Sequence, residues 1–355
     1  MNDPTLAYAA LREARTSRCS AHGGFTVVAR HADVRAAAEE AGVFSSRALS
    51  IPGGPGTSAP IMVDPPEHVR YRTVLSRLLS REMTLALRAQ ITSLVHNLGS
   101  TLHTGEEVEA SAAFSEPLAV GMLIRAMGLA REDEHRLLRW ADILVFRENP
   151  DRATGVLASR QLADYFGAAS LHPALRDADL TADERVNLCL TMFYAALGPL
   201  RHVTNSALVL LEHGSVVRDA VLAAGADRDA VVEELFRYVS PVQSIGRVVT
   251  EDVERFGRSF RSGERALLVW GSANQDPSVF DDPSEFHADR APNPHLAFGA
   301  GIHRCPGALL SRVAIGAVVD ELLDQLPPYR VRVNGLRRQY GHTCGLSRIP
   351  LSFAV

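Results

Sequence analysis

The chain has 355 residues, is 46% hydrophobic and carries a formal net charge of −4. This length and composition predict a globular protein with one large core or two ordinary ones, and they argue against a disordered chain. All 37 basic residues are arginines, spread along the chain without a basic tail or an aromatic-interleaved patch, so we expect no nucleic-acid partner.

The N-terminus and the cysteines bear on the cellular compartment. Residues 1–10 lack a positively charged segment followed by an apolar stretch, and no run reaches the roughly 18 apolar residues of a membrane span. We therefore expect a cytoplasmic protein without a membrane segment. Cys19, Cys189, Cys305 and Cys344 lie far apart with no C-x-x-C pair. This spacing argues against a zinc site and a disulfide framework, but it allows one cysteine to be a single metal ligand.

Helical periodicity dominates the sequence, with a few short alternating runs that predict strands. In chain order the predicted elements are a strand at Phe25–Arg30, helices at Leu85–Leu102, Pro117–Ala130, Glu132–Phe146, Ala182–Leu211 and Ala230–Val239, strands at Gly246–Val249 and Ala266–Trp270, and a helix at Pro306–Leu326. Stretches rich in Gly and Pro interrupt this order without forming a low-complexity linker. The sequence predicts one domain over residues 1–355, mainly α with a minor β portion.

A cysteine precedes the last predicted helix, in "HLAFGAGIHRCPGALLSRVAIG". Pro306 suits the first helical position, where its missing N–H costs nothing, so Cys305 is predicted to be the N-cap. The free backbone N–H groups and the helix dipole would then favour a thiolate at Cys305. Such a thiolate is suited to nucleophilic attack or to a soft metal centre such as haem iron. The alternative is an inert buried cysteine at a helix cap.

The same stretch resembles the haem-binding loop of the cytochrome P-450 family, Phe-x-x-Gly-x-x-x-Cys-x-Gly, at Phe298, Gly301, Cys305 and Gly307. The resemblance implies the P-450 fold and haem b as the cofactor. It also implies that Cys305 is the iron ligand and that Phe298 and Gly307 belong to the cofactor-binding loop.

Further segments agree with the family in order and spacing. "EELFRYVSPV" resembles its Glu-x-x-Arg helix at Glu234 and Arg237, and "FHADR" resembles the segment that supplies a third member, Arg290. Taken alone, Glu234 and Arg237 are an i,i+3 pair worth roughly 0.2 to 0.5 kcal/mol on a helix surface. The resemblance implies that they belong to a buried core network instead.

Four basic side chains match the family's haem propionate-binding positions. His68 and Arg72 lie in "DPPEHVRYR", Arg247 lies in "SIGRVVTED", and His303 lies two residues before the cysteine. Cationic donors around carboxylates form charge-assisted hydrogen bonds, which suits this role. Each of the four could also be an ordinary surface charge. The resemblance is strongest to soluble bacterial members of the family.

The helix that crosses the distal face of the haem in this family is interrupted here, in "CLTMFYAALGPLRHVTNSAL". A gapless match places Gly198 and Pro199 at the family's pair of small residues, Arg201 at its acid and His202 at its threonine. The resemblance implies that the acid and alcohol, which organise water and deliver protons to bound dioxygen, are absent. Arginine cannot shuttle protons at neutral pH, because its pKa lies above about 12. Pro199 predicts that the helix kinks or opens at this turn.

Several interpretations of Arg201 and His202 follow. The substitutions could matter only for packing. Arg201 could bind an anionic substrate group, since no acid lies within four residues of it and a buried charge needs a partner. The pair could act on peroxide, with His202 as general base and acid. The enzyme could instead use no external oxidant, or His202 could be a sixth iron ligand.

Together these features predict a haem-thiolate oxidoreductase that tailors a small-molecule natural product, with unusual oxygen activation and with Arg201 and His202 as catalytic residues. A ferredoxin and its reductase would supply electrons if it is a monooxygenase. The alternatives are a peroxide-dependent peroxygenase or peroxidase, an oxygen-independent rearrangement or dehydration enzyme, a haem-based sensor, and a non-catalytic P-450-like partner protein. The chain is short for the family between Phe146 and Leu180, where the substrate is covered, and that segment carries no readable specificity pattern.

Overall fold

Helices make up most of this protein, and strands form a smaller part, which confirms the predicted fold class. The structure is a computed structural model. It describes residues 5–51, 58–102, 107–146, 151–223, 225 and 227–353. The α-helices are α1 Thr5–Glu13, α2 His31–Glu39, α3 Glu67–Leu78, α4 Arg81–Leu102, α5 Glu116–Met127, α6 Glu134–Ala141, α7 Arg152–Ala168, α8 Pro173–Arg176, α9 Ala182–Leu210, α10 Val216–Ala223, α11 Arg228–Val239, α12 Trp270–Ala273 and α13 Ala308–Asp320.

The strands form one larger sheet and several small ones. The larger sheet has the order β1-β2-β8-β5-β3, in which β2 and β8 are parallel and the other neighbours are antiparallel. Its strands are β1 Thr16–Cys19, β2 Phe25–Val28, β3 Phe44–Ser45, β5 Ile245–Val249 and β8 Arg265–Leu268. The smaller sheets contain β4 Glu107–Glu109, β9 Tyr329–Val331 and β12 Pro350–Phe353, the pair β6 Val253–Arg255 and β7 Arg258–Phe260, and the pair β10 Arg337–Gln339 and β11 Gly345–Arg348.

The predicted strands are found at the expected places, whereas two predicted helices are divided. The segment predicted as one helix over Glu132–Phe146 consists of a short 3₁₀ turn, α6, and a π-helical segment at Asp142–Phe146. The helix predicted over Pro306–Leu326 begins later, at Ala308, and ends in a π-helical segment at Glu321–Gln325. A π-helical turn is wider than an α-turn, and the 3.6-residue period of apolar side chains does not distinguish the two.

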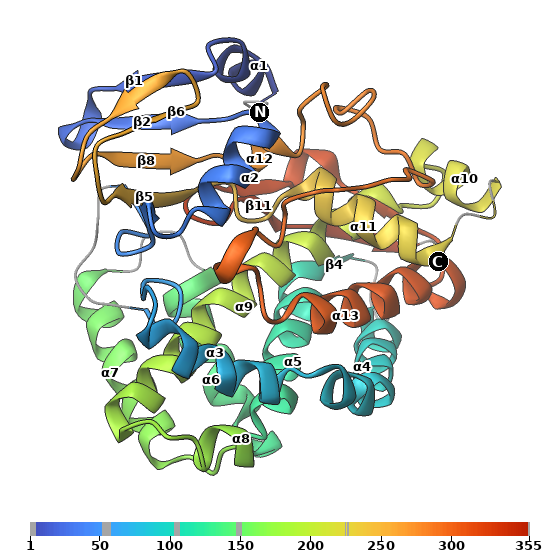
Figure 1. Cartoon of the computed structure of the whole chain (residues 1–355). Helices are drawn as coiled ribbons and strands as arrows, with labels where there is room; N and C mark the ends of the chain where they lie inside the picture. Colours follow the sequence, from blue (N-terminus) through green and yellow to red (C-terminus); the bar gives the residue numbers. More distant parts are fainter. Residues whose placement is uncertain are drawn as a thin grey trace.

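The main hydrophobic core lies among the helices, and a second core lies beneath the larger sheet. Figure 1 shows the larger sheet with α1, α2 and α12 on one side of the molecule and α3 to α9 on the other, with α11 and α13 near the middle. Within the described ranges, no helix has both the length and the apolar character needed to cross a membrane.

The long helix α9 runs through the helical part of the molecule and packs against α5, α7, α11, α13 and β11. It begins with a capping box, in which Thr181 Oγ1 accepts the N–H of Glu184 at 3.2 Å and the Glu184 carboxylate accepts the N–H of Thr181 at 2.8 Å. Helical structure continues through Pro199 to Leu210. Of the kink or opening predicted at Pro199, the opening is therefore not found, since the helix remains helical through this turn.

Candidate active site

A tight loop precedes Cys305 and fixes its position. Gly299 and Gly301 have positive φ angles of 71° and 66°, which glycine adopts readily. A Cβ on residue 301 would lie 2.3 Å from the carbonyl oxygen of Ala38 in α2, so no side chain fits there. The loop is closed by the N–H of Cys305, which donates to the carbonyl oxygen of Phe298 at 2.8 Å. The glycines therefore let the cysteine loop lie directly against α2.

Cys305 is not the N-cap of α13, contrary to the sequence prediction. The N-cap is Gly307 and the first helical residue is Ala308, so Pro306 lies before the helix. Burial raises the pKa of the Cys305 thiol. A hydrogen bond from the Gly307 N–H and the charges of Arg72, Arg312 and Arg304 offset this only in part. The N–H of Gly307, the N-cap residue, still donates to the sulfur and favours the thiolate.

Cys305 also has an unusual combination of enclosure and exposure. The residue retains accessible surface, yet its thiol is surrounded by protein atoms closely enough for desolvation to dominate its pKa. The protein atoms around the sulfur therefore leave part of the residue open to a ligand. The sulfur is thus available to a ligand held inside the protein.

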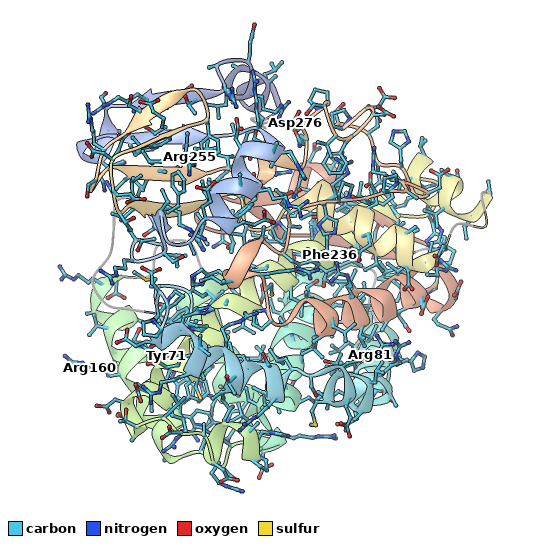
Figure 2. The ribbon with its side chains drawn as sticks, in the orientation of Figure 1. Tyr71, Arg81, Arg160, Phe236, Arg255 and Asp276 are labelled. Carbon is cyan, nitrogen blue, oxygen red and sulfur yellow. The ribbon has the colours of Figure 1, made fainter. Side chains whose placement is uncertain are left out.

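The cysteine loop is anchored to two helices through the aromatic ring of Phe298. The ring centroid lies 4.6 Å from that of Phe236, which Figure 2 labels on α11. The guanidinium of Arg312, from α13, lies 4.5 Å from the Phe298 centroid. Arg312 also donates to the Glu233 carboxylate of α11 at 2.7 Å. Phe298 is therefore held between a ring on α11 and a cation that is itself fixed by α11.

The four basic side chains predicted to bind propionates converge from three segments of the chain. The ring centroids of His68, from α3, and His303 lie 4.5 Å apart. Burial, together with the charges of Arg247 and His68, lowers the pKa of His303 to about 3. Burial lowers the pKa of Arg247, on β5, to about 10, and the charge of Asp64 offsets this only in part. Arg72 lies near the cysteine and donates to the carbonyl oxygen of Arg304 at 2.9 Å.

Asp64 is the acid whose charge acts on this basic cluster, and two buried ring nitrogens of the cluster have no partner among the described residues. His68 Nε2 and His303 Nε2 are buried, and neither has a partner among the described residues. Among the residues that the structure describes, the side chain of Arg247 donates only to the adjacent carbonyl oxygen of Gly246. Leaving buried polar groups without partners costs about 1 to 3 kcal/mol each. An accessible thiol next to two arginines and two histidine rings with unpartnered nitrogens fits the haem expected from the resemblance, because haem offers an iron to the sulfur and two carboxylates to these donors.

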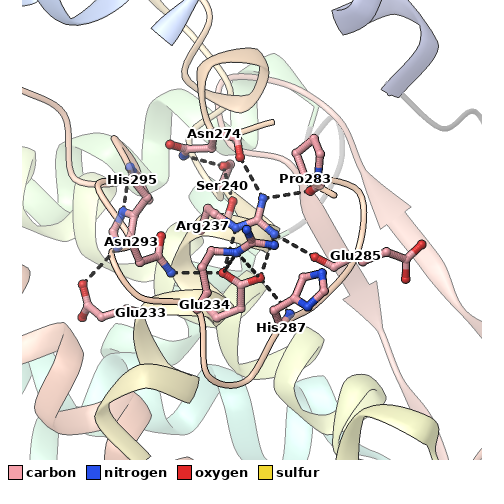
Figure 3. A network of polar contacts seen from close by, with 12 residues as sticks. Glu233, Glu234, Arg237, Ser240, Asn274, Pro283, Glu285, His287, Asn293 and His295 are labelled. Carbon is pink, nitrogen blue, oxygen red and sulfur yellow. Dashed lines mark hydrogen bonds and ion pairs between the residues drawn. The ribbon is translucent and has the colours of Figure 1, made fainter. Parts of the chain in front are cut away.

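The Glu-x-x-Arg pair forms a buried network, as the resemblance implied (Figure 3). Glu234 accepts two hydrogen bonds from Arg237, both at 2.8 Å, and both side chains are fully buried. Arg290 also donates to Glu234 at 3.1 Å. The remaining donors of Arg237 bind the main-chain carbonyl oxygens of Asn274, Pro283 and Glu285. The network therefore fixes the irregular segment before the cysteine loop to α11.

Arg201 is enclosed by protein and paired with an internal acid. Its side chain is 1% exposed and lies 3.3 Å from a carboxylate oxygen of Glu116 at the start of α5. The guanidinium lies 4.7 Å from the ring centroid of Phe146 and also donates to Gln339 on β10. The sequence shows no acid near Arg201, but the fold brings Glu116 to it. Arg201 therefore does not need a substrate anion as its partner, because Glu116 supplies the negative charge.

His202 is fully buried on the same turn and binds the β10–β11 hairpin. Its Nδ1 lies 3.0 Å from the carbonyl oxygen of Leu346, which also accepts from Asn205 at 2.8 Å. Gly345 packs against the His202 side chain so closely that a Cβ on residue 345 would lie 2.5 Å from His202 Cβ. A residue that contacts a bound ligand must retain accessible surface in the protein alone, as Cys305 does. Arg201 and His202 have almost none, so their geometry favours positioning the hairpin over contact with a substrate.

Two residues on the loop between β10 and β11 lie near α9 or are enclosed by protein, and the sequence did not identify either as a candidate site residue. The hydroxyl of Thr343 lies beside Gly198, 3.1 Å from the position of a Cβ on that residue. His342 is exposed, yet burial by surrounding atoms lowers its pKa. His342 thus has the same combination of properties as Cys305. The only sequence signal was a histidine and two polar residues between the glycines of "YGHTCGL", far from any recognised motif.

Comparison with known proteins agrees with this geometry. A family model described as "Cytochrome P450" matches residues 228–327. The "Biotin biosynthesis cytochrome P450" of Bacillus subtilis is 31% identical over 285 residues, which cover 74% of this chain and 71% of that protein. The "Cyclomarin C epoxidase CymV" of Salinispora arenicola is 29% identical and covers 90% and 87%, respectively. The structure of CYP109E1 from Bacillus megaterium in complex with corticosterone superposes with a TM-score of 0.88, at 25% identity, covering 99% of both chains.

The family binds haem b, and the enclosed Cys305 and the basic cluster suit that cofactor. The residues matched by the family model include both the buried Glu234–Arg237 pair and the cysteine loop. The overall fold also matches that of the solved structure. We conclude that this chain belongs to the cytochrome P450 family of haem-thiolate oxidoreductases.

Proposed function

We propose that this protein oxidises a small-molecule natural product, with Cys305 holding the haem iron. The accessible sulfur of Cys305 lies near Arg72 and near the buried Nε2 atoms of His68 and His303, which have no partner among the described residues; this is the observation that carries the proposal. His68, Arg72, Arg247 and His303 would hold the haem carboxylates. The bound haem supplies the redox chemistry. The names of two relatives, one assigned to biotin biosynthesis and one called a cyclomarin C epoxidase, support a natural-product substrate.

The protein's own residues contribute positioning and charge. Phe298 and Arg312 hold the loop of Cys305 against α11, while the N–H of Gly307 donates to the sulfur. Arg72 and Arg247 would neutralise the carboxylates of the bound group through charge-assisted hydrogen bonds, and the rings of His68 and His303 would donate further hydrogen bonds. Arg201 and His202 hold the β10–β11 hairpin in place beside the middle of α9. We also propose a ferredoxin and its reductase as the electron donors when the oxidant is dioxygen.

The haem ligand is tested by a substitution at Cys305. Cys305→Ser should lose the absorption band that the carbon monoxide complex of a reduced thiolate-ligated haem gives. Cys19→Ser is the matched control, because Cys19 lies on β1 in the larger sheet. It should keep the band. A Cys305→Ser protein that retains the thiolate spectrum would refute the ligand assignment.

The oxidant is tested by comparing three reactions of one candidate substrate. The first contains ferredoxin, reductase and NADPH, the second contains peroxide alone, and the third contains no oxidant under anaerobic conditions. We expect turnover in the first reaction. The protons would then reach the bound oxygen without an acid and an alcohol from the centre of α9. Turnover only with peroxide would identify a peroxygenase, and turnover in the anaerobic reaction would identify an oxygen-independent enzyme. Haem-loaded protein inactive with every substrate tried in all three would favour a non-catalytic partner role.

A further inference from the structure

The middle of α9 has no side chain at Gly198, and another element fills the adjacent space. A Cβ on residue 198 would lie 3.1 Å from Thr343 Oγ1 and 3.6 Å from Val145 Cγ1. The hydroxyl group next to this turn of α9 is therefore provided by the loop between β10 and β11. One turn earlier, Ala195 and Ala196 retain accessible surface although Phe193 and Leu197 beside them are fully buried.

The loop that carries this hydroxyl is fixed by main-chain bonds. Thr343 forms an isolated antiparallel bridge with Val242, and the N–H of Cys344 donates to the carbonyl oxygen of Pro241 at 2.9 Å. Arg201 and His202 of α9 hold β10 and β11, the two strands of the same hairpin. The position of the Thr343 hydroxyl is thus determined from both ends of the loop, as a group that must be preorganised requires.

His342, the neighbouring residue, lies on the same loop and retains accessible surface. It is exposed, whereas burial by surrounding protein lowers its pKa and so favours the neutral ring. No described residue forms a hydrogen bond with its imidazole in the structure. A neutral imidazole donates from one nitrogen and accepts at the other. It can release the proton of one nitrogen to a bound polar group and take up a proton from water at the other, so that the ring returns to its neutral form.

We propose that Thr343 and His342 supply, from the β10–β11 loop, the hydroxyl and the proton-carrying side chain that the centre of α9 lacks. This role requires both side chains to lie beside the substrate in the haem-loaded protein, so the inference rests on the proposed function. It assigns to the hairpin a role in proton handling, and it limits Arg201 and His202 to holding the hairpin in place.

The first test measures whether the two side chains lie near the haem. The protein is labelled at the histidine ring carbons and threonine methyl groups and loaded with ferric haem or with diamagnetic zinc protoporphyrin. We expect the signals of His342 and Thr343 to be shifted or lost in the ferric protein alone. The signals of His135 and of Thr101, which are both exposed and lie outside the proposed haem site, serve as controls and should be unchanged. Unshifted His342 and Thr343 signals in haem-loaded protein would overturn the inference and leave the proposed function intact.

The second test moves the hydroxyl group back to α9. Its probe reaction is guaiacol oxidation by hydrogen peroxide, normalised to haem content. Thr343→Ala and His342→Ala should each lower the rate, on the order of 100-fold, as loss of an acid–base group does. Gly198→Ser/Thr343→Ala should recover much of the loss, because the serine enters the space that Thr343 vacates. Tyr340→Phe, at a side chain that is 59% exposed, is the control and should match the wild type.

The outcomes separate the two proposals. Shifted signals together with slower guaiacol oxidation in Thr343→Ala and His342→Ala support the inference. Unchanged rates in both variants, with normal haem content, overturn the proton-handling role even if the signals shift. Protein that binds no haem, or that holds haem without a thiolate ligand, overturns the proposed function and the inference with it.

Discussion

His202 donates its Nδ1 proton to the carbonyl oxygen of Leu346, 3.0 Å away and fully inside the protein. A carbonyl oxygen can only accept, so Nδ1 carries the proton and Nε2 is left with a lone pair. Nε2 is buried and has no hydrogen-bond partner in the described part of the chain. The histidine is therefore held neutral, and protonating Nε2 in the folded protein would place a charge in a site that cannot accommodate it.

This arrangement predicts a pH-dependent stability. Burial, and secondarily the charge of Arg201, lowers the pKa of His202 to about 4 in the folded protein, against about 6.5 in the unfolded chain. Between these values the unfolded chain binds the proton and the folded protein does not, so the free energy of unfolding falls as the pH decreases from 6.5 to 4. The loss attributable to this residue approaches about 3 kcal/mol. His202→Leu cannot titrate and should lack it.

Urea unfolding of wild type and His202→Leu at pH 7 and at pH 5 measures this difference. The stability of the wild type relative to His202→Leu should decline on going to pH 5. His135→Leu, at an exposed histidine, is the control and should follow the wild type at both pH values. An equal loss of stability in wild type and His202→Leu would contradict a neutral, buried His202.

The Arg201–Glu116 pair leads to a prediction about charge. Burial raises the pKa of Glu116, and Arg201 opposes that rise. Arg201→Met would leave the half-enclosed carboxylate without its cation, which we expect to destabilise the protein by about 2 to 3 kcal/mol. Arg201→Met/Glu116→Gln should recover at least half of this loss, because the uncompensated charge is gone. Thermal unfolding of the two single variants and the double variant measures the coupling. Additive losses would show that the two residues do not interact.

The network at Glu234 leads to a prediction about folding. Glu234→Gln would leave Arg237 and Arg290 in a buried site without their shared carboxylate, at an expected cost of about 3 to 5 kcal/mol. We expect a lower unfolding temperature and a smaller yield of haem-loaded protein. Glu285→Gln is the matched control, because Glu285 is exposed and contributes only its main-chain carbonyl oxygen to Arg237. Similar unfolding temperatures for both variants would argue against an essential network.

The parts of this fold that could be predicted from the sequence are those with local signals. The helix periods, the glycines before Cys305 and the i,i+3 spacing of Glu234 and Arg237 are all visible within a few residues. The start of α13 could not be placed, because Pro306 is also compatible with a position before the helix, where Gly307 becomes the N-cap.

The surroundings of α9 could not be predicted for a different reason. The partners of Arg201 and His202 come from Glu116, Gln339 and Leu346, which are 85, 138 and 144 positions away in the chain. Whether a buried arginine faces an internal acid or a ligand depends on tertiary contacts of this kind, which no local pattern encodes. The same holds for Thr343, because only the tertiary fold shows that its hydroxyl lies beside Gly198.

The contact between the hairpin and α9 can be tested at Gly345. A Cβ on this residue would lie 2.5 Å from His202 Cβ and 2.6 Å from His202 Cγ, well inside contact distance. Gly345→Ala must therefore displace β11 from α9, and we expect a loss of about 1 to 3 kcal/mol in the free energy of unfolding. Gly316→Ala is the matched control, because a Cβ at this position in α13 would meet nothing within 4 Å. Alanine in an open helical position should stabilise the protein by about 0.5 to 1 kcal/mol.

The same pair of variants distinguishes a steric cause from loss of the imidazole. Because the first clash involves His202 Cβ, which alanine also carries, adding His202→Ala should not restore the stability of Gly345→Ala. Restoration would mean that the ring, and not the close approach of the two backbones, limits the space at residue 345. Without restoration, Gly345 is required because β11 lies directly on α9, the position from which the following loop brings Thr343 to Gly198.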